Sequence, residues 1–486
     1  MSEKSGPLSR LANWLDSRLS LSYPLLRPVP QYAINPLYWL GALTVVAFLI
    51  QGITGMIMML YYVPSPSTAF QSTQYIFQSV YYGRFLETIH LYTAYAMIML
   101  AFMHMMRGYF VSVHKKPREL MWLTGMVMGF VTLGFGFTGY LLPWTVVSKS
   151  ATDVGIGIVD ALPAPLSSFV SFLIVGAGGD ATELLRFYDL HIVVLPAVLL
   201  VLLTVKMWML EAHGIGEPTG GSSKPERTVS LPIFPDVTMY LLELAAMFGS
   251  AMLLISVIFP LNLPPEYTPQ LAAQYTPQPD WYFLWIYQVL KISVFEGAGL
   301  PIALSVVTVV FLVLILLPFI DRGHERSMLG RPKFVTIGLV FIAELIVLTY
   351  WGLVTPGQII PIANAILVLG GTAVLVGAIS LGVYAFLRDP NKSSSPSTRP
   401  MMTSMSRMFR RAAVMVLLLA AGAFAIGLSL SGLVNLILSG TLLALTRLLL
   451  YLLMLGLAAF ATTIFIYRVE LRSGSLKRRI YFLESS

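Results

Sequence analysis

The chain has 486 residues, of which 57% are hydrophobic and 11% are charged, and its formal net charge is +8. Soluble domains carry about 25% charged residues, so this composition excludes an ordinary soluble protein and predicts an integral membrane protein. Cysteine is absent, which excludes disulfides, thiolate nucleophiles and cysteine-ligated iron–sulfur clusters from these residues. The positive charge is expected to mark cytoplasmic loops, with no nucleic-acid partner.

The first residues, 1–35, are polar and amphipathic without a cleavable signal, and we predict a cytoplasmic segment. Apolar segments long enough to cross a bilayer, which takes about 20 residues, then follow near residues 36–62, 85–110, 121–143, 188–210, 237–260, 299–320, 334–354, 359–387, 411–435 and 441–467. The Pro/Gly-interrupted stretch 155–175 is typical of short surface helices instead. The predicted fold class is therefore an all-α, polytopic membrane protein.

The predicted spans fall into three groups. The first four form a helix bundle over residues 36–215, and the next four, over 216–387, complete an eight-helix core. A Pro/Ser-rich linker at 388–405 precedes two additional transmembrane helices and a cytoplasmic tail at 406–486. Lys and Arg gather in alternate loops, and the positive-inside rule then places both termini in the cytoplasm of a multi-pass cell-membrane protein.

Three histidines lie inside predicted spans, where ionisable groups are costly and usually functional. His90 and His104 are separated by an interval of 14 on the second span, which is about 21 Å along one helix face. On the fourth span, which runs the same way, the interval from His191 to Lys206 is 15. These groups pair by depth, His90 with His191 outside and His104 with Lys206 inside. Axial nitrogen pairs at two depths suit two haems stacked across the bilayer.

Four glycines repeat the histidine interval. The same interval of 14 separates Gly41 from Gly55 on the first span and Gly125 from Gly139 on the third. A flat macrocycle between helices needs missing side chains at its own level. Ordinary small-residue helix packing explains glycines but not a shared interval, so the repetition favours a haem-binding four-helix bundle.

With these residues in view, the chain resembles cytochrome b, the membrane subunit of quinol-oxidising Rieske–cytochrome b (bc-type) complexes. The resemblance covers about residues 25–387. It is carried by the ligand positions at two depths on the second and fourth spans and by the glycine pairs beside them, which together we call the ladder. Seven motifs also carry it: KKPREL, WLTG, TGYLLPW, RFYDLH, FPD, TPQPDWYFLW and LTYWG. The family implies two haems, with b-type preferred over other haem types. It also implies quinol and quinone as substrates.

The motif PDWY, Pro279 to Tyr282, stands where the family has Pro-Glu-Trp-Tyr at its quinol site. The resemblance implies that Asp280 accepts a quinol proton, with a side chain one methylene shorter than the family's, and that Tyr282 assists. Pro279, Trp281 and Tyr140 are expected to line the pocket. On the inner side, Glu211 and Asp236 fall where quinone contacts are expected, although both also suit ordinary interfacial carboxylates.

The chain departs from the family at several haem-site positions. Arg107 matches an arginine that the family implies at the inner haem propionates. At the outer haem, where the family has a second arginine, this chain has Glu87, and Arg84 one turn earlier is a candidate substitute. Lys206 stands where the fourth haem histidine belongs. Three interpretations stay open: its neutral amine ligates the inner iron, it extends to the cytoplasmic surface, or the inner haem is missing. His213 lies about 10 Å deeper than Lys206, which is too far along the helix for it to replace Lys206 as the ligand.

These observations predict a cytochrome b subunit of a respiratory quinol:acceptor oxidoreductase, coupled to proton translocation. The expected partners are a Rieske iron–sulfur protein, membrane lipid, and a c-type cytochrome, copper protein or oxidase subunit as acceptor, in a dimeric complex. Two alternatives remain. A proton-coupled secondary transporter would use the membrane histidines as a relay, and a haem-bearing assembly subunit would lack quinol chemistry.

Overall fold

Long apolar helices dominate the protein, as its computed structural model shows for residues 28–387 except 177, 217–229 and 296. The predicted N-terminal amphipathic segment up to residue 27, the linker and the two C-terminal spans lie outside the described residues. The chain divides into two units, Met1–Ser380 and Leu381–Ser486, and the sites below belong to the first.

Within the described residues, seven helices are long and apolar enough to cross a membrane: Leu40–Met59, Gly83–Phe110, Glu119–Leu141, Asp180–His213, Ile233–Ile258, Pro332–Val354 and Ile362–Tyr384. The expected sixth span is shorter, because α14 (Leu300–Ile315) is capped by Leu316 and the four-residue α15 (Leu317–Ile320) follows with a proline in its first turn. The all-α, polytopic membrane fold is confirmed.

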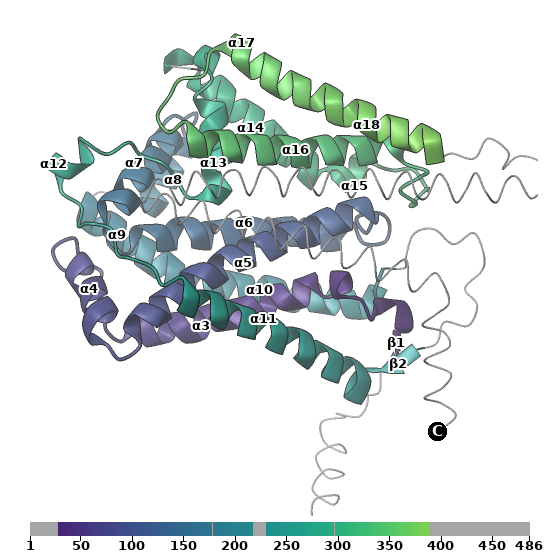
Figure 1. Ribbon diagram of the computed structural model, residues 1–486, viewed down its shortest axis with the longest axis horizontal. Helices are drawn as coiled ribbons and strands as arrows, with labels where there is room; N and C mark the ends of the chain where they lie inside the picture. The colour runs from purple at the N-terminus through teal and green to yellow at the C-terminus, as the bar shows by residue number, and fades with distance from the viewer. Residues whose placement is uncertain (1–27, 177, 217–229, 296, 388–486) are drawn as a thin grey trace, which may run out of the picture. The chain divides into compact units, whose positions relative to one another are not determined.

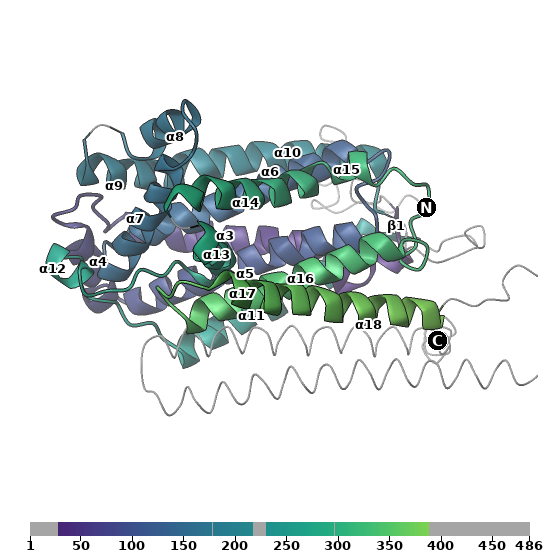
Figure 2. The ribbon, with the colours of Figure 1, turned by 90° about the horizontal axis from the view of Figure 1, so that it is seen from above.

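Four helices form the bundle that carries the histidines. α3 (Leu40–Met59) packs on α5 (Gly83–Phe110), α5 on α6 (Glu119–Leu141), and α6 on α10 (Leu195–His213). Figures 1 and 2 show these helices running side by side along a common direction. α10 continues α9 (Asp180–Asp189) through a π-helical turn at Leu190–Val194.

Shorter helices cover one end of the bundle. They are α4 (Ala69–Ser79), α7 (Val146–Asp160) and α8 (Leu166–Ile174), and the last two include the stretch expected to form short surface helices. α7 starts at a capping box, in which Thr145 and Ser148 each accept from the other's backbone N–H, which satisfies donors that a helix start leaves free.

The second part of the chain follows a short antiparallel pair, β1 (Pro28–Pro30) with β2 (Ser230–Pro232), in which Pro28 faces Pro232. A kinked turn at Ile233–Val237 leads into α11 (Thr238–Ile258), which packs on α3 and α5. The remaining helices are α12 (Pro269–Ala272), α13 (Trp281–Leu290), α16 (Pro332–Val354), α17 (Ile362–Ala365) and α18 (Gly371–Leu387). α13 packs on α16.

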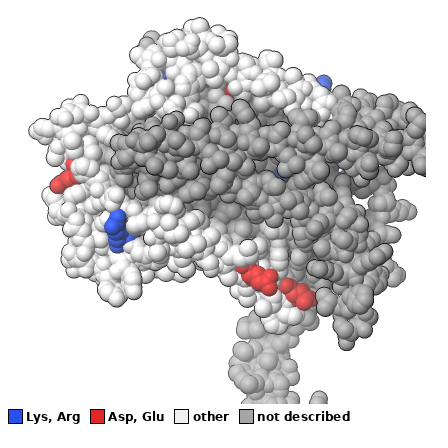
Figure 3. Space-filling model, viewed as in Figure 1, with Lys and Arg blue, Asp and Glu red and all other residues white. Residues whose placement is uncertain are grey.

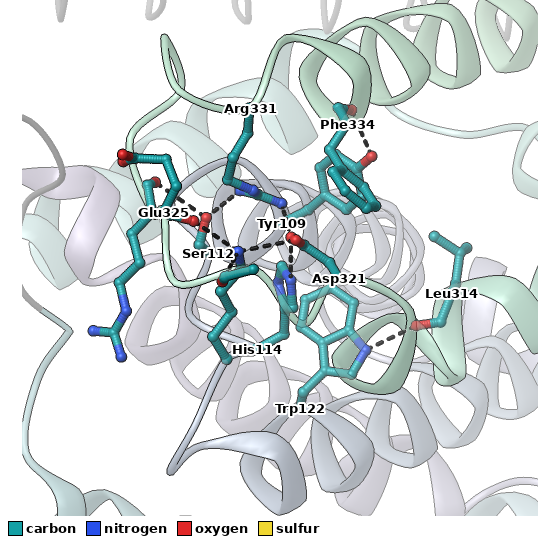
Figure 4. A network of polar contacts seen from close by, with 12 residues as sticks. Tyr109, Ser112, His114, Trp122, Leu314, Asp321, Glu325, Arg331 and Phe334 are labelled. Atoms are coloured by element: carbon teal, nitrogen blue, oxygen red, sulfur yellow. Dashed lines mark hydrogen bonds and ion pairs between the residues drawn. The ribbon is translucent and has the colours of Figure 1, made fainter.

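A buried charge cluster joins the two parts of the chain at the α5–α6 loop (Figure 4). Asp321 accepts from His114 Nε2 at 3.1 Å and Lys115 Nζ at 2.9 Å, and it also binds Arg331, which contacts Ser112 as well. Burial lowers the pKa of His114 to about 4, against the opposing effect of Asp321. We call these five residues the loop cluster; four of them, all but Ser112, are ionisable and at most 7% exposed.

The visible face of the described residues is largely uncharged (Figure 3). Exposed apolar side chains lie along the spans, among them Leu200, Val201 and Trp208 on α10. An apolar surface on this scale would be unfavourable in water and is suited to contact with lipid.

Candidate functional site

The outer pair, His90 on α5 and His191 in the π-helical turn, lies inside the bundle with ring centres 6.4 Å apart. We keep the names outer and inner from the predicted orientation. Each imidazole faces a glycine. A Cβ atom on Gly55 would lie 3.4 Å from His90 Cε1, and one on Gly139 would lie 2.5 Å from His191 Cε1. Gly139 can therefore not carry a side chain while His191 keeps this position.

Two threonines determine which nitrogen of each outer imidazole carries the proton. Thr54 Oγ1 lies 2.8 Å from His90 Nδ1, and Thr138 Oγ1 lies 3.1 Å from His191 Nδ1. Both hydroxyls donate to carbonyl oxygens in their own helices, at 2.7 and 2.8 Å. Each oxygen is thus left to accept from Nδ1–H, and this leaves the Nε2 lone pair free to bind a metal.

These threonines were not predicted from the sequence. A signal was present, because each precedes a ladder glycine, in the dipeptides Thr54-Gly55 and Thr138-Gly139. The dipeptide alone is a weak guide. Thr124 precedes Gly125 in the same way, yet its hydroxyl donates to Leu120 O on an exposed part of α6.

The inner pair, His104 on α5 and Lys206 on α10, also lies beside its glycines. A Cβ atom on Gly41 would lie 3.1 Å from His104 Cε1, and one on Gly125 would lie 2.6 Å from Lys206 Nζ. Lys206 interacts electrostatically with His104. Its side chain therefore turns into the bundle, and the structure does not show the extended surface conformation that the sequence left open.

The π-helical turn accounts for the unequal spacing of the two ligand pairs. The interval is 14 between His90 and His104, which share one α-helix, and 15 between His191 and Lys206. A π-helical turn holds one more residue than an α-helical turn. The turn at Leu190–Val194 takes up this extra residue, so Lys206 reaches the level of His104.

An apolar layer separates the outer and inner pairs. Ala47, Met97 and Leu199 are buried against one another with Phe48, Met128, Val131, Phe135 and Phe248 around them. Each of the three buried residues lies about midway between the two ladder positions of its own helix.

These residues fit haem iron at the outer pair. With metal–nitrogen bonds of about 2 Å, two imidazoles on opposite sides of an iron place their ring centres about 6 Å apart, close to the 6.4 Å between His90 and His191. The inner pair offers two nitrogens at one level, and His104 Nδ1 is buried without a hydrogen-bond partner among the described residues.

The arginines expected at the propionates have other contacts. The guanidinium of Arg107 lies 3.9 Å from the ring centre of Tyr38, near the inner pair on the same helix. Arg84 donates to Leu261 O at 2.8 Å and to Asn262 Oδ1 at 2.7 Å. Arg84 therefore holds the loop after α11 and does not turn to the outer pair.

Asp280 is buried at the start of α13 and is approached by three phenols. Its Oδ1 accepts from Tyr95 Oη at 3.0 Å and from the Trp281 backbone N–H at 3.1 Å. The Tyr282 hydroxyl is a further donor to this carboxyl, and Tyr140 lies close enough to interact with it electrostatically. Its Oδ2 is buried and has no hydrogen-bond partner among the described residues.

Burial gives this carboxyl an unusual acidity. It raises the pKa of Asp280 from its ordinary 3.8 to about 6, while Tyr95, the Trp281 backbone N–H and the nearby Tyr282 hydroxyl act in the opposite direction. A carboxyl with a pKa near neutrality can both accept and release a proton under ordinary conditions. Tyr95 was not predicted from the sequence, where one tyrosine in a span gives no distinguishing signal.

The surroundings of Asp280 are closely packed. A Cβ atom on Gly136 of α6 would lie 2.8 Å from Tyr282 Oη, so this glycine lets the tyrosine approach the bundle. Trp281 and Tyr282 both pack against Tyr95, with ring centres 6.2 and 6.4 Å apart. Pro279 is half-buried beside them. At the other end of the spans, Glu211 and Asp236 are both exposed.

Comparison with known proteins assigns both parts of the chain to one family. The family model "Cytochrome b(N-terminal)/b6/petB" matches residues 95–268, and "Cytochrome b(C-terminal)/b6/petD" matches residues 271–370. A "Cytochrome bc complex cytochrome b subunit" of Chlorobaculum thiosulfatiphilum is 32% identical over 71% of this chain and 82% of its own length. The chain belongs to the cytochrome b family. Family membership implies haem cofactors and a role in electron transport.

Other relatives of this cytochrome b cover different shares of it. A "Cytochrome b" of Sulfolobus acidocaldarius is 32% identical over 74% of this chain and 69% of its own length. The "Cytochrome b6" of Heliobacterium mobile is 38% identical over 42% of this chain and 99% of its own length. A solved "Hyperthermophilic respiratory Complex III" chain has the same fold, with a TM-score of 0.62 at 24% identity, over 77% of this chain and 97% of that chain.

Proposed function

We propose that this cytochrome b is the quinol-oxidising membrane subunit of a bc-type respiratory complex, a quinol:acceptor oxidoreductase that translocates protons. The main support is the Asp280 carboxyl, which is buried among three phenols with Oδ2 free of partners in the described residues. Aromatic surroundings with one convergent acceptor suit a hydroquinone, whose ring is apolar and whose hydroxyl needs a hydrogen-bond partner.

Asp280 Oδ2 accepts the proton of a quinol hydroxyl in this proposal. A quinol that is oxidised to quinone loses two protons and two electrons. Bound haem supplies one-electron acceptance and transfer, and His90, His191, His104 and Lys206 would hold two haems, b-type first of all. One electron and the second hydroxyl proton pass to a Rieske-type partner, and the other electron crosses the bundle to a quinone near Glu211 and Asp236 on the inner side.

The surroundings of the complex belong to the same proposal. The chain is expected in the cytoplasmic membrane with both termini in the cytoplasm, as its basic loops indicate. The final acceptor is a c-type cytochrome, a copper protein or an oxidase subunit, and the complex is a dimer. Pro279, Trp281, Tyr140 and Tyr282 line the quinol pocket, and Arg107 serves the inner haem.

We further infer that Lys206 ligates the inner iron through its neutral amine. Its Nζ lies within the bundle, at the level of Gly125 and close to His104. The test is Lys206→Ala compared with Val205→Ala, a lipid-facing neighbour that is 40% exposed. Magnetic spectroscopy of the oxidised complex should show one haem turned high-spin by Lys206→Ala alone. Two haems that both remain low-spin would contradict this ligation.

The proposed function is tested by Asp280→Asn, which keeps the size of the side chain and removes its proton-accepting charge. Quinol-driven reduction of the Rieske-type partner should fall by about 10²- to 10⁴-fold, the usual contribution of a positioned base. The haem spectrum should not change. An unchanged rate in the intact complex would favour the assembly-subunit alternative.

A further inference from the structure

Asp280 presents two different oxygens to its surroundings. Oδ1 accepts two hydrogen bonds, from the Tyr95 hydroxyl at 3.0 Å and the Trp281 backbone N–H at 3.1 Å. Oδ2 is buried and accepts none from the described residues. Since a buried acceptor without a partner is costly, this oxygen has the environment expected of an atom that meets a ligand.

The two donors come from different elements and fix the carboxylate from two sides. The Trp281 N–H belongs to the first turn of α13, where Asp280 is the N-terminal cap. Tyr95 belongs to α5, one helical turn and a little more after His90. A short aspartate side chain reaches only a little beyond the helix cap, and the long tyrosine side chain spans the distance from α5.

We propose that Tyr95 is a positioning residue, whose hydroxyl holds Oδ1 of Asp280 so that Oδ2 remains the atom that accepts the quinol proton. This inference rests on the proposed function. In the step itself the quinol O–H bond breaks and its proton passes to Oδ2. The two electrons and the second hydroxyl proton leave with the acceptors named above, and the proton of Tyr95 stays on its phenol oxygen.

The groups that face Asp280 determine how this step depends on pH. They are the phenols of Tyr95 on α5, Tyr140 on α6 and Tyr282 on α13, and no cation of the described residues is among them. The ionised carboxylate is therefore stabilised by neutral donors. Removal of the Tyr95 hydroxyl takes away one of them and makes the carboxyl harder to ionise.

The test is the pH profile of quinol oxidation in the intact complex with Tyr95→Phe. The acidic limb is the low-pH part of the profile, where the rate falls as Asp280 becomes protonated. Loss of one hydrogen bond to the carboxylate should move this limb upward by about one pH unit, and the rate should recover at higher pH. The matched control is Tyr92→Phe on the same helix, which removes a hydroxyl that donates to Phe259 O at 2.6 Å. Tyr92→Phe should leave the limb in place.

A second variant keeps the test decisive if Tyr95→Phe fails to assemble. Incorporation of 3-fluorotyrosine at position 95 strengthens the phenol as a donor with almost no change of shape, so the limb should move downward. The positioning role would be overturned if the acidic limb did not move in the variant that assembles. It would also be overturned if the rate of quinol oxidation fell by the same factor at every pH. Failure of the unaltered complex to oxidise quinol would instead refute the proposed function.

Discussion

Thr138 Oγ1 lies 3.1 Å from His191 Nδ1 while it donates to the carbonyl oxygen of Gly134 at 2.8 Å. The hydroxyl therefore accepts from the imidazole, as the Phe135 carbonyl oxygen also does, and both contacts orient the ring. Such partners of metal ligands keep the ring in place and make the other nitrogen a better ligand. This contact belongs to the outer pair, since His104 Nδ1 of the inner pair has no such partner in the described part of the chain.

Thr138→Val removes the acceptor while keeping the shape of the side chain. We expect affinity for the outer haem to fall by about 10- to 100-fold and its reduction potential to rise, because a less basic imidazole favours the oxidised iron less. The measurement is a redox titration of the haem spectrum. Thr132→Val on the same helix, which removes a buried hydroxyl that donates to Met128 O, should change neither value.

Gly139→Ala tests whether the ladder glycines make room for the ligands. The added Cβ would lie 2.5 Å from His191 Cε1, so the imidazole must move and the outer haem should be lost or turn high-spin. Gly129→Ala is the control on the same helix, because nothing lies within 4 Å of its added Cβ. Equal haem content in the two purified variants would show that the glycine interval has no bearing on haem binding.

The sequence was sufficient for features that repeat at a fixed interval or depend on composition. Apolar runs identified the seven spans of the described residues, and the shared interval picked out the four glycines that lie beside His90, His104, His191 and Lys206. Each of these signals depends on the regular rise and rotation of one helix, which can be read without knowledge of tertiary structure.

Features that depend on contacts between distant helices could not be predicted. Tyr95 meets Asp280 across 185 positions of the chain, and the loop cluster joins His114 to Asp321 across 207. The extra residue between His191 and Lys206 appeared in the sequence only as an irregular spacing, without the π-helical turn that absorbs it. The inward direction of Lys206 was also beyond the sequence, because a lysine near a helix end has two accessible directions.

The acidity of Asp280 predicts a pH dependence for quinol oxidation. Burial raises the pKa of this carboxyl to about 6, and only the ionised form can accept a proton. The rate should therefore rise as pH increases through about 6 and level off about one unit above it. Steady-state rates of the intact complex measure this. A rate that already levels off near the ordinary carboxyl pKa of about 4 would contradict the assignment.

Asp321→Asn tests the loop cluster that joins the two parts of the chain. The substitution leaves Lys115 and Arg331 buried without their common counter-charge, which typically costs about 3–5 kcal/mol. The thermal midpoint of the purified protein should fall accordingly. Glu325→Gln neutralises an exposed carboxylate in the same loop but keeps the oxygen that accepts from the Ser327 backbone N–H, so it should change stability by no more than about 0.5 kcal/mol. Similar midpoints for both variants would show that the cluster contributes little.

Electron transfer across this protein depends most on the ability of the second and fourth membrane segments to hold iron porphyrin at two levels. The direct measurement is the ratio of haem to polypeptide in the purified complex, obtained from haem extraction and the reduced-minus-oxidised spectrum. We predict two haems on this chain, of which one is lost or altered by His191→Ala and the other by His104→Ala. A chain that is purified intact without haem, or whose haem content is unaffected by both substitutions, would contradict the account.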